Sequence, residues 1–267
     1  MSKGKRIVIL ADPLDNQYAG IHIYTREMIR SVTEPDRKNE YILIREKKSD
    51  DFPHLRQIAV PNLPLWTGYQ AMRFFVIFPT IILKLKPDIV IEPAHFGPFN
   101  LPRTIKRMTI IHDLTPIKFP ELHRGYSAML QRIFLKRILN KAHLILTNSN
   151  NTLKDVKEVF PFTGNKLKMI YPGKDRLFKP TDPGEIRKKH KLSEPYFIFV
   201  GTIEPRKNLL MLLKSYQKFR AQSSMHVHLV IAGKYGWKSD AFKEALGDCP
   251  YCEDIRIMGY VDRNDLP

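Results

Sequence analysis

Cysteine, long apolar runs and acidic residues are all scarce in this sequence of 267 residues. Its two cysteines, Cys249 and Cys252, are followed by neither a second cysteine pair nor histidines at metal-ligand spacing. The sequence therefore predicts no metal or redox site, and the thiols are interpreted as reduced side chains of a cytoplasmic protein. The most apolar segment, residues 74–83, is shorter than the ~20 residues of a membrane-spanning helix. The apolar run at residues 7–11 is too short for the core of a secretory signal.

Positive charge is in excess and unevenly distributed. There are 44 Lys and Arg against 27 Asp and Glu, a net charge of +17. Residues 1–190 hold 33 cationic and 18 acidic side chains, whereas residues 191–267 hold 11 and 9. Such an excess favours an anionic partner, for which we expect a membrane surface or a phosphorylated acceptor. A solvated cationic face is the alternative. Nucleic acid is not expected, because no nucleic-acid module and no basic patch with stacking aromatics is found.

Short apolar segments alternate with helical patterns along most of the chain, which predicts an α/β fold with a mostly parallel, doubly wound sheet. In the helix predicted from Ile21, the spacing places Ile21, Tyr24, Met28 and Val32 on one face. The helix after residue 150 has Asn150 or Asn151 as its expected N-cap. The predicted strands of the first domain lie at residues 6–12, 41–46, 56–61, 87–94, 107–113, 142–149 and 166–170, and its predicted helices at 21–34, 72–86 with a bend at Pro79, 126–141 and 151–160.

A stretch rich in proline, glycine and charge separates two domains. We expect the first domain at residues 1–178, the linker at 179–195 and a partial second domain at 196–267. After the linker the pattern restarts with three strands and two helices. Since ligands bind beyond the carboxyl ends of parallel strands, the loops at 12–20, 92–97 and 112–120 are the ones expected to carry function.

The segment FVGTIEPRKNLLMLLKSY at residues 199–216 predicts a strand, a tight loop and a helix. Arg206 and Lys207 lie where this helix begins, although cations are disfavoured at that end of a helix dipole. Free backbone N–H groups and two cations together favour a bound phosphate, which Arg206 can hold through two hydrogen bonds. Gly201 allows close approach of the backbone to a ligand.

Several segments, in order, resemble the retaining glycosyltransferases of the "group 1" family (family 4), which have the GT-B fold. They are AGIHIYTREMI at 19–29, IHDLTPIKFPE at 111–121, LTNSNNTLKDV at 146–156, IYPGKDRLFKP at 170–180, VGTIEPRKNL at 200–209, IAGK at 231–234 and IMGYVDRNDLP at 257–267. The resemblance covers nearly the whole chain. It implies two Rossmann-like domains, a nucleotide diphosphate-sugar donor held by the second and an acceptor held by the first.

Carried over residue by residue, the resemblance implies catalytic roles for His112, Arg206 and Lys207, with Asp113 as an orienting residue. Arg206 and Lys207 would bind the donor diphosphate. The other donor-binding residues would be Ala19, Gly20, Gly201, Lys234, Tyr260 and Val261. No metal and no cofactor is expected, because cations and helix N-termini can stabilise the leaving phosphate. His22, His95, His143, His226 and His228 are interpreted as packing or surface residues.

The sequence departs from the family after Pro267, where a glutamate pair and further strands are expected. We therefore expect an incomplete second domain with an unpaired sheet edge. A partner chain or a missing segment would complete it. The expected function is transfer of a hexosyl group, with mannosyl as one option, to a glycan or lipid-linked acceptor at the cytoplasmic face of a membrane. The alternative is a non-catalytic or split subunit that binds a sugar nucleotide.

Overall fold

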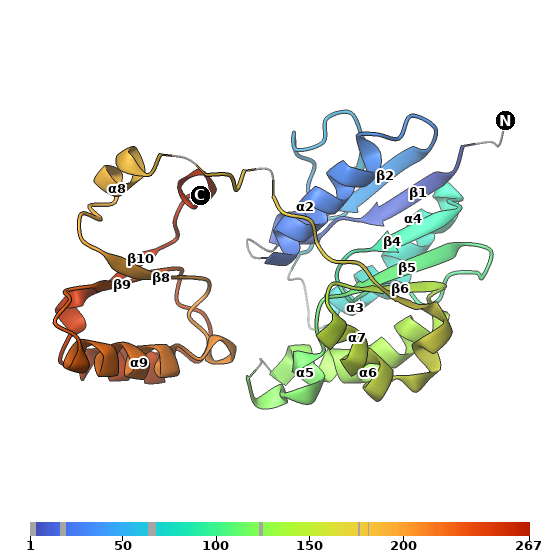
Figure 1. Cartoon of the computed structure of the whole chain (residues 1–267). Helices are drawn as coiled ribbons and strands as arrows, with labels where there is room; N and C mark the ends of the chain where they lie inside the picture. The colour runs from blue at the N-terminus through green and yellow to red at the C-terminus, as the bar shows by residue number, and fades with distance from the viewer. Residues whose placement is uncertain (1–3, 17–19, 64–67, 123–124, 176, 181) are drawn as a thin grey trace. The chain divides into compact units, whose positions relative to one another are not determined.

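The computed structural model describes residues 4–16, 20–63, 68–122, 125–175, 177–180 and 182–267. It divides into two compact units, Met1–Gly173 and Lys174–Pro267 (Figure 1). Both contain parallel sheets with helices packed on them. The predicted α/β class is confirmed.

The first unit is built on a seven-stranded parallel sheet with the strand order β3-β2-β1-β4-β5-β6-β7. The chain winds outward from β1 to β3 and then crosses to β4 on the other side of β1, which makes the sheet doubly wound. Its strands are β1 (Arg6–Leu10), β2 (Glu40–Arg45), β3 (Arg56–Ala59), β4 (Ile89–Glu92), β5 (Lys106–Ile111), β6 (Leu144–Thr147) and β7 (Leu167–Met169).

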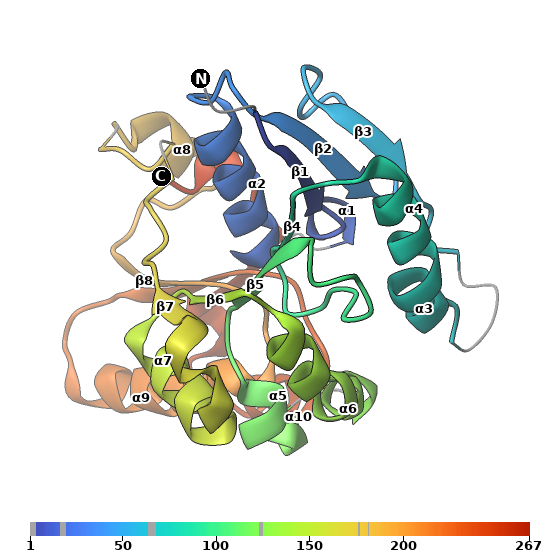
Figure 2. The ribbon, with the colours of Figure 1, turned by 90° about the vertical axis from the view of Figure 1, so that its right-hand side faces the viewer.

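Helices cover both faces of this sheet, as Figure 2 shows for α2 and α4. Ile29 of α2 packs against one set of β1 and β2 side chains, and Phe78 and Ile82 of α4 pack against the other set. The remaining core of this unit lies between β5, β6, α6 and α7. The helical segments are α1 (Pro13–Asn16), α2 (Gly20–Thr33), α3 (Tyr69–Met72), η1 (Arg73–Ile77), α4 (Phe78–Leu85), α5 (Thr115–Lys118), η2 (Pro120–Leu122), α6 (Gly125–Lys141), α7 (Asn150–Val159) and η3 (Pro161–Lys166).

Near Pro79, where a bend was expected, the helix contains a π-helical segment, η1, directly before α4. Proline has no N–H, so the carbonyl of Phe75, four residues earlier, loses its helical donor. The side-chain amide of Asn100 donates to that carbonyl at 2.8 Å. The loop between β4 and β5 thus replaces the hydrogen bond that the proline removes.

Two local predictions need correction. Residues 13–16 form the short helix α1 instead of loop. The N-cap of α7 is Ser149, whose side chain accepts from the Thr152 N–H at 3.1 Å, and neither Asn150 nor Asn151. The four residues predicted on one face of α2 are half-buried, and Met28 and Val32 pack against the core; the buried residues of the helix are His22, Thr25, Ile29 and Thr33.

The second unit has a three-stranded parallel sheet in the order β10-β9-β8. The helices α9 and α10 pack on it around Leu213, Tyr216, Ile231 and Phe242. The helix α8 forms within the predicted linker, in this second unit. Its elements are α8 (Gly184–Lys189), β8 (Tyr196–Val200), η4 (Pro205–Lys207), α9 (Leu209–Gln222), β9 (His228–Ala232), α10 (Asp240–Gly247), η5 (Cys252–Asp254), β10 (Ile255–Gly259) and η6 (Arg263–Asp265). Across the described residues of both units, no helix is long and apolar enough to cross a membrane.

Candidate functional site

The three loops that follow β8, β9 and β10 meet at one edge of the second unit's sheet. Because the strands are parallel, their carboxyl ends lie on the same side. The Ile203 N–H donates to the Lys234 carbonyl at 3.0 Å, and the Gly236 N–H donates to the Ile203 carbonyl at 2.9 Å. A further bridge joins Gly233 to Gly259. Backbone hydrogen bonds thus extend beyond the strands and fix the loops to one another.

Two glycines make this close pairing sterically allowed. Gly201 has a φ of +153°, a conformation that side-chain-bearing residues rarely adopt. A Cβ on Gly233 would lie 1.8 Å from the Gly201 carbonyl oxygen, so only glycine fits there. The sequence pointed to Gly201 for approach to a ligand; the structure adds Gly233, which sequence reasoning missed, as its contact partner.

The two predicted cations lie in η4, a single turn that ends one residue before α9. Arg206 Nε and Nη2 both donate to Glu204 Oε1, at 3.0 and 2.7 Å. The Glu204 side chain is 3% exposed and that of Arg206 is 34% exposed. The guanidinium edge formed by Nε and Nη2 is therefore occupied by Glu204, which holds the group in place. Glu204 was not among the predicted site residues, although an acid two positions before the arginine was a visible signal.

The amino end of α9 adjoins this turn. Asn208 precedes the helix with a φ of 51° and makes no side-chain capping bond there. The N–H groups of Met211 and Leu212 bond to the Asn208 carbonyl, as the start of the helical pattern requires. The first N–H groups of a helix have no intrahelical acceptor, and the helix dipole is positive at this end. Together with the exposed Lys207, this end of α9 favours an anion.

Lys234 and Tyr260, both predicted to contact the donor, are exposed and lie together. The Lys234 ammonium is 5.3 Å from the centre of the Tyr260 ring. Val261 is half-buried next to Tyr260. The carboxyl edge of β8, β9 and β10 thus gathers the predicted residues Gly201, Arg206, Lys207, Lys234, Tyr260 and Val261 in one region of the second unit.

The second predicted group lies in the first unit, directly after β5. The His112 ring is buried, and its Nε2 lies 2.7 Å from the Pro93 carbonyl oxygen. A carbonyl only accepts, so Nε2 carries the proton and Nδ1, which is 3.5 Å from Asn148 Nδ2, is the acceptor. Burial and the adjacent His95 lower the pKa of His112 to about 4, outweighing the opposing effects of Pro93 and Asp113. His112 is therefore neutral near pH 7.

His95, interpreted from the sequence as a packing or surface residue, is buried beside His112. The two ring centres are 5.5 Å apart, and His95 Nε2 lies 3.2 Å from the His112 backbone nitrogen. Desolvation lowers the pKa of His95 as well. Its φ of 58° is left-handed, which is uncommon for a residue with a side chain. His95 is thus a packing residue, as expected, and it places a second buried imidazole next to His112.

The other predicted residues of the first unit have different surroundings. The Asp113 carboxylate accepts from the Thr115 N–H at 3.0 Å and from its hydroxyl at 2.6 Å, so it stabilises the start of α5. Gly20 is exposed at the first position of α2. Ala19 lies outside the described residues. Tyr24 of α2 packs edge-on against His112, with ring centres 4.8 Å apart, which links α2 to the end of β5.

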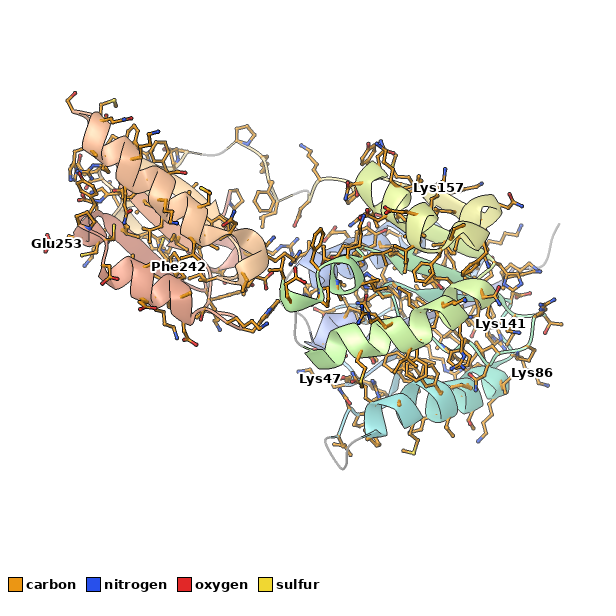
Figure 3. The ribbon with its side chains drawn as sticks, turned by 90° about the horizontal axis from the view of Figure 1, so that it is seen from below. Lys47, Lys86, Lys141, Lys157, Phe242 and Glu253 are labelled. Carbon is orange, nitrogen blue, oxygen red and sulfur yellow. The ribbon has the colours of Figure 1, made fainter. Side chains whose placement is uncertain are left out.

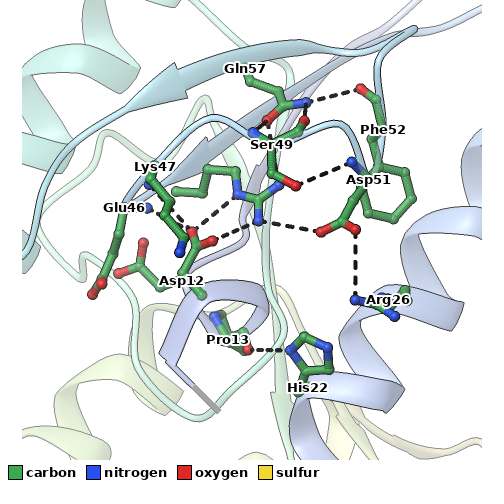
Figure 4. Close-up of polar contacts among 12 residues, drawn as sticks. Asp12, Pro13, His22, Arg26, Glu46, Lys47, Ser49, Asp51, Phe52 and Gln57 are labelled. Carbon is green, nitrogen blue, oxygen red and sulfur yellow. Dashed lines mark hydrogen bonds and ion pairs between the residues drawn. The ribbon is translucent and has the colours of Figure 1, made fainter. Parts of the chain in front are cut away.

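Buried ion pairs fix the loops at the carboxyl ends of β1 and β2 (Figure 4). The Asp15 carboxylate pairs with Arg45 at 2.6 Å and accepts from the Glu46 N–H at 3.0 Å. Arg73 forms two hydrogen bonds with Asp12 and also donates to the Val60 carbonyl. Each carboxylate is thus matched by an arginine, and these acids serve the loop structure.

A third buried pair lies at the end of β4. Glu92 accepts two hydrogen bonds from Arg107, at 2.6 and 2.8 Å, and a third from the Thr109 hydroxyl.

Across the described part of the chain, no group of three or more His, Cys, Asp or Glu side chains could hold a metal ion.

Two family models match successive parts of the chain. The model described as Glycosyltransferase Family 4 matches residues 18–176. The chain belongs to this family. A second model, described as Glycosyl transferases group 1, matches residues 182–267. The resemblance inferred from the motifs is confirmed, and the two matched ranges fall on the two units.

Among curated relatives, the chain is 29% identical to O-antigen chain mannosyltransferase B of Escherichia coli, over 65% of this chain and 47% of that protein. It is 21% identical to N-acetylgalactosamine-N,N'-diacetylbacillosaminyl-diphospho-undecaprenol 4-alpha-N-acetylgalactosaminyltransferase of Campylobacter jejuni, over 58% of this chain and 40% of that protein. The chain thus spans about half the length of the curated relatives it matches.

Solved structures show the same fold at low identity. The complex of Anabaena HepE with UDP-glucose has a TM-score of 0.67 at 13% identity, covering 97% of this chain and 70% of that one. A glycosyltransferase from Rickettsia africae has a TM-score of 0.61 at 12% identity, covering 98% and 70%. These matches confirm the predicted GT-B type of fold.

Proposed function

We propose that the chain binds a nucleotide diphosphate-sugar at the carboxyl edge of β8, β9 and β10 and takes part in transfer of its hexosyl group. The observation that carries this proposal is the grouping of Arg206, Lys207 and Lys234 with the amino end of α9 on loops fixed by Gly201 and Gly233. The names of the relatives support it, since one is a mannosyltransferase and HepE was solved with UDP-glucose.

The chemistry suits these groups. Cleaving the bond between sugar and diphosphate leaves negative charge on the phosphate, and fixed cations and N–H dipoles aimed at that charge lower the barrier. Lys207 supplies a mobile point charge, while Glu204 orients Arg206. No resident metal is needed in this proposal.

The proposed reaction retains the configuration of the sugar. Retaining hydrolases place two carboxylates about 5 Å apart. Asp12, Asp15 and Glu92 lie at or near the carboxyl ends of β1 and β4, and each is engaged with a buried arginine. This supports a route in which the leaving phosphate deprotonates the acceptor. Neutral His112 then contributes through hydrogen bonding, with Nδ1 as an acceptor, rather than as a cation.

The proposed acceptor is a glycan or lipid-linked glycan bound by the first unit. Both named relatives act on such molecules according to their names, an O-antigen chain and a diphospho-undecaprenol. The reaction would then take place at the cytoplasmic face of a membrane, with the protein bound peripherally.

Calorimetry with UDP, GDP and ADP tests donor binding. We expect micromolar-range or tighter binding of one of them, lost in Lys207→Ala and kept in Lys214→Ala, an exposed lysine farther along α9. Absence of binding by all three nucleotides would refute the proposal. Incubation with labelled nucleotide sugars, followed by NMR of the product's anomeric proton, tests transfer and retention. Binding without turnover would instead support the non-catalytic subunit.

A further inference from the structure

Two of the longer helical segments of the first unit contain no acidic residue. One is residues 69–86, which include α3, η1 and α4, and the other is α6. The segments adjoin, because the rings of Phe75 in η1 and Phe134 in α6 have centres 4.8 Å apart, and Phe99 packs near both. Their combined solvent-facing surface is called here the acid-free face.

Large apolar side chains lie exposed on both segments of the acid-free face. Val76 is 57% exposed and Leu83 46%, seven residues apart on the first segment. Met129 and Ile133 are each 48% exposed, four residues apart on α6. The four-residue spacing places Met129 and Ile133 on one side of α6. Burial of these side chains is favourable wherever water is excluded.

Exposed cations border the same apolar side chains. They are Lys84 and Lys86 on the first segment, and Arg132, Lys136, Arg137 and Lys141 on α6. Seen from below, α4 and α6 run alongside each other, with Lys86 and Lys141 at the same end of the pair (Figure 3). Lys157 of α7 lies on the other side of the unit in that view. The positive charge of this face is therefore not neutralised by acids on its own helices.

We propose that the acid-free face is a docking surface for an anionic lipid bilayer. Helices that lie in the interface of a membrane typically combine Lys and Arg with exposed aliphatic groups. The cations contact the headgroups and the apolar groups lie at the acyl boundary. Single-stranded nucleic acid would instead favour stacking aromatics, and the four exposed apolar residues are aliphatic. A second copy of this face would bring like charges together.

This inference rests on the proposed function only in taking the acceptor to be lipid-linked. It assigns the surface that would hold the protein at the membrane. Its test needs neither donor nor acceptor.

The test is flotation of the purified chain with phosphatidylcholine vesicles and with mixed phosphatidylglycerol–phosphatidylcholine vesicles. We expect binding only to the mixed vesicles, decreasing as salt rises. The double variant Arg132→Gln, Lys136→Gln should bind about 25-fold more weakly, since each cation near an anionic surface contributes a factor of about five. Val76→Ser with Ile133→Ser should also weaken binding, because apolar contact is part of the interaction.

The matched control is Lys154→Gln with Lys157→Gln on α7, which removes two exposed lysines from a helix that also carries Asp155 and Glu158. Its vesicle binding should equal that of the wild type. An equal loss in the control would show that net charge alone acts and would overturn the proposal. The proposal would also be overturned if the chain did not bind the mixed vesicles, or if the serine variants bound them as well as the wild type. It would likewise be overturned if the chain bound single-stranded DNA more tightly than vesicles, or formed a dimer that the serine variants dissociate. Nucleotide calorimetry on the same variants should be unchanged, which separates this outcome from failure of the donor site.

Discussion

Replacing Arg206 by alanine has two separable consequences, one for the stability of the second unit and one for donor binding. The side chain pairs with Glu204, whose carboxylate is 3% exposed, and its own exposure is 34%. Breaking a fully buried pair costs about 3–5 kcal/mol and an exposed pair about 0–1 kcal/mol. This pair is intermediate, so we expect Arg206→Ala to reduce the free energy of unfolding by about 1–2 kcal/mol.

The second consequence is a weaker interaction with a diphosphate. A hydrogen bond to a charged group contributes about 1.5–3 kcal/mol, so loss of the guanidinium should raise the nucleotide Kd about 10- to 150-fold. The double variant Glu204→Gln, Arg206→Ala replaces the Glu204 carboxylate, which would otherwise be buried and unpaired, by a neutral amide of the same shape. It should recover most of the lost stability and none of the lost affinity.

Urea denaturation followed by circular dichroism measures the first effect, and calorimetry with UDP or GDP measures the second. Recovery of both stability and affinity in the double variant would show that Arg206 only supports the fold of η4. An unchanged Kd in Arg206→Ala would likewise refute the assignment of this residue to the phosphate. In either case Glu204 would remain a structural partner of the turn.

Three further predictions follow from burial and steric fit. We expect His112 to remain neutral down to about pH 4 in an NMR titration, and titration near pH 6.5 would contradict this. In the unfolded state the ring binds a proton from about pH 6.5, so the free energy of unfolding should decrease by up to about 3 kcal/mol between pH 6.5 and pH 4. This decrease should be smaller in His112→Gln. In urea denaturation, Gly233→Ala should destabilise the second unit by at least about 1–3 kcal/mol, because the added Cβ has no room. The control Gly247→Ala, whose Cβ would meet nothing within 4 Å, should have no destabilising effect, and equal urea midpoints for the two variants would refute the steric argument. Glu92→Ala should reduce the free energy of unfolding by about 3–5 kcal/mol, because it leaves a buried arginine unpaired. Lys5→Ala breaks an exposed pair and should reduce it by at most about 1 kcal/mol; similar losses in both variants would show that burial is not the cause.

Much of the fold was predictable because strands and helices leave periodic signals. Every predicted strand of the first domain corresponds to a strand of the sheet, since buried parallel strands are short unbroken apolar runs. The Ser149 cap was missed because several neighbouring polar residues could serve, and only backbone geometry selects one. Packing likewise decided which residues of α2 are buried most deeply, and these include the polar His22 and Thr25.

The sequence by itself determined the alternation of strands and helices, the positive charge and the motifs that identify the family, because these depend on residue type and spacing along the chain. Only the tertiary structure decided which residues meet: Glu204 with Arg206, His95 with His112, Gly201 with Gly233, and Phe75 of η1 with Phe134 of α6. The physical reason is that these contacts depend on the angle and register of elements brought together by the sheet. Hydrophobic spacing along one segment carries no information about what packs against it.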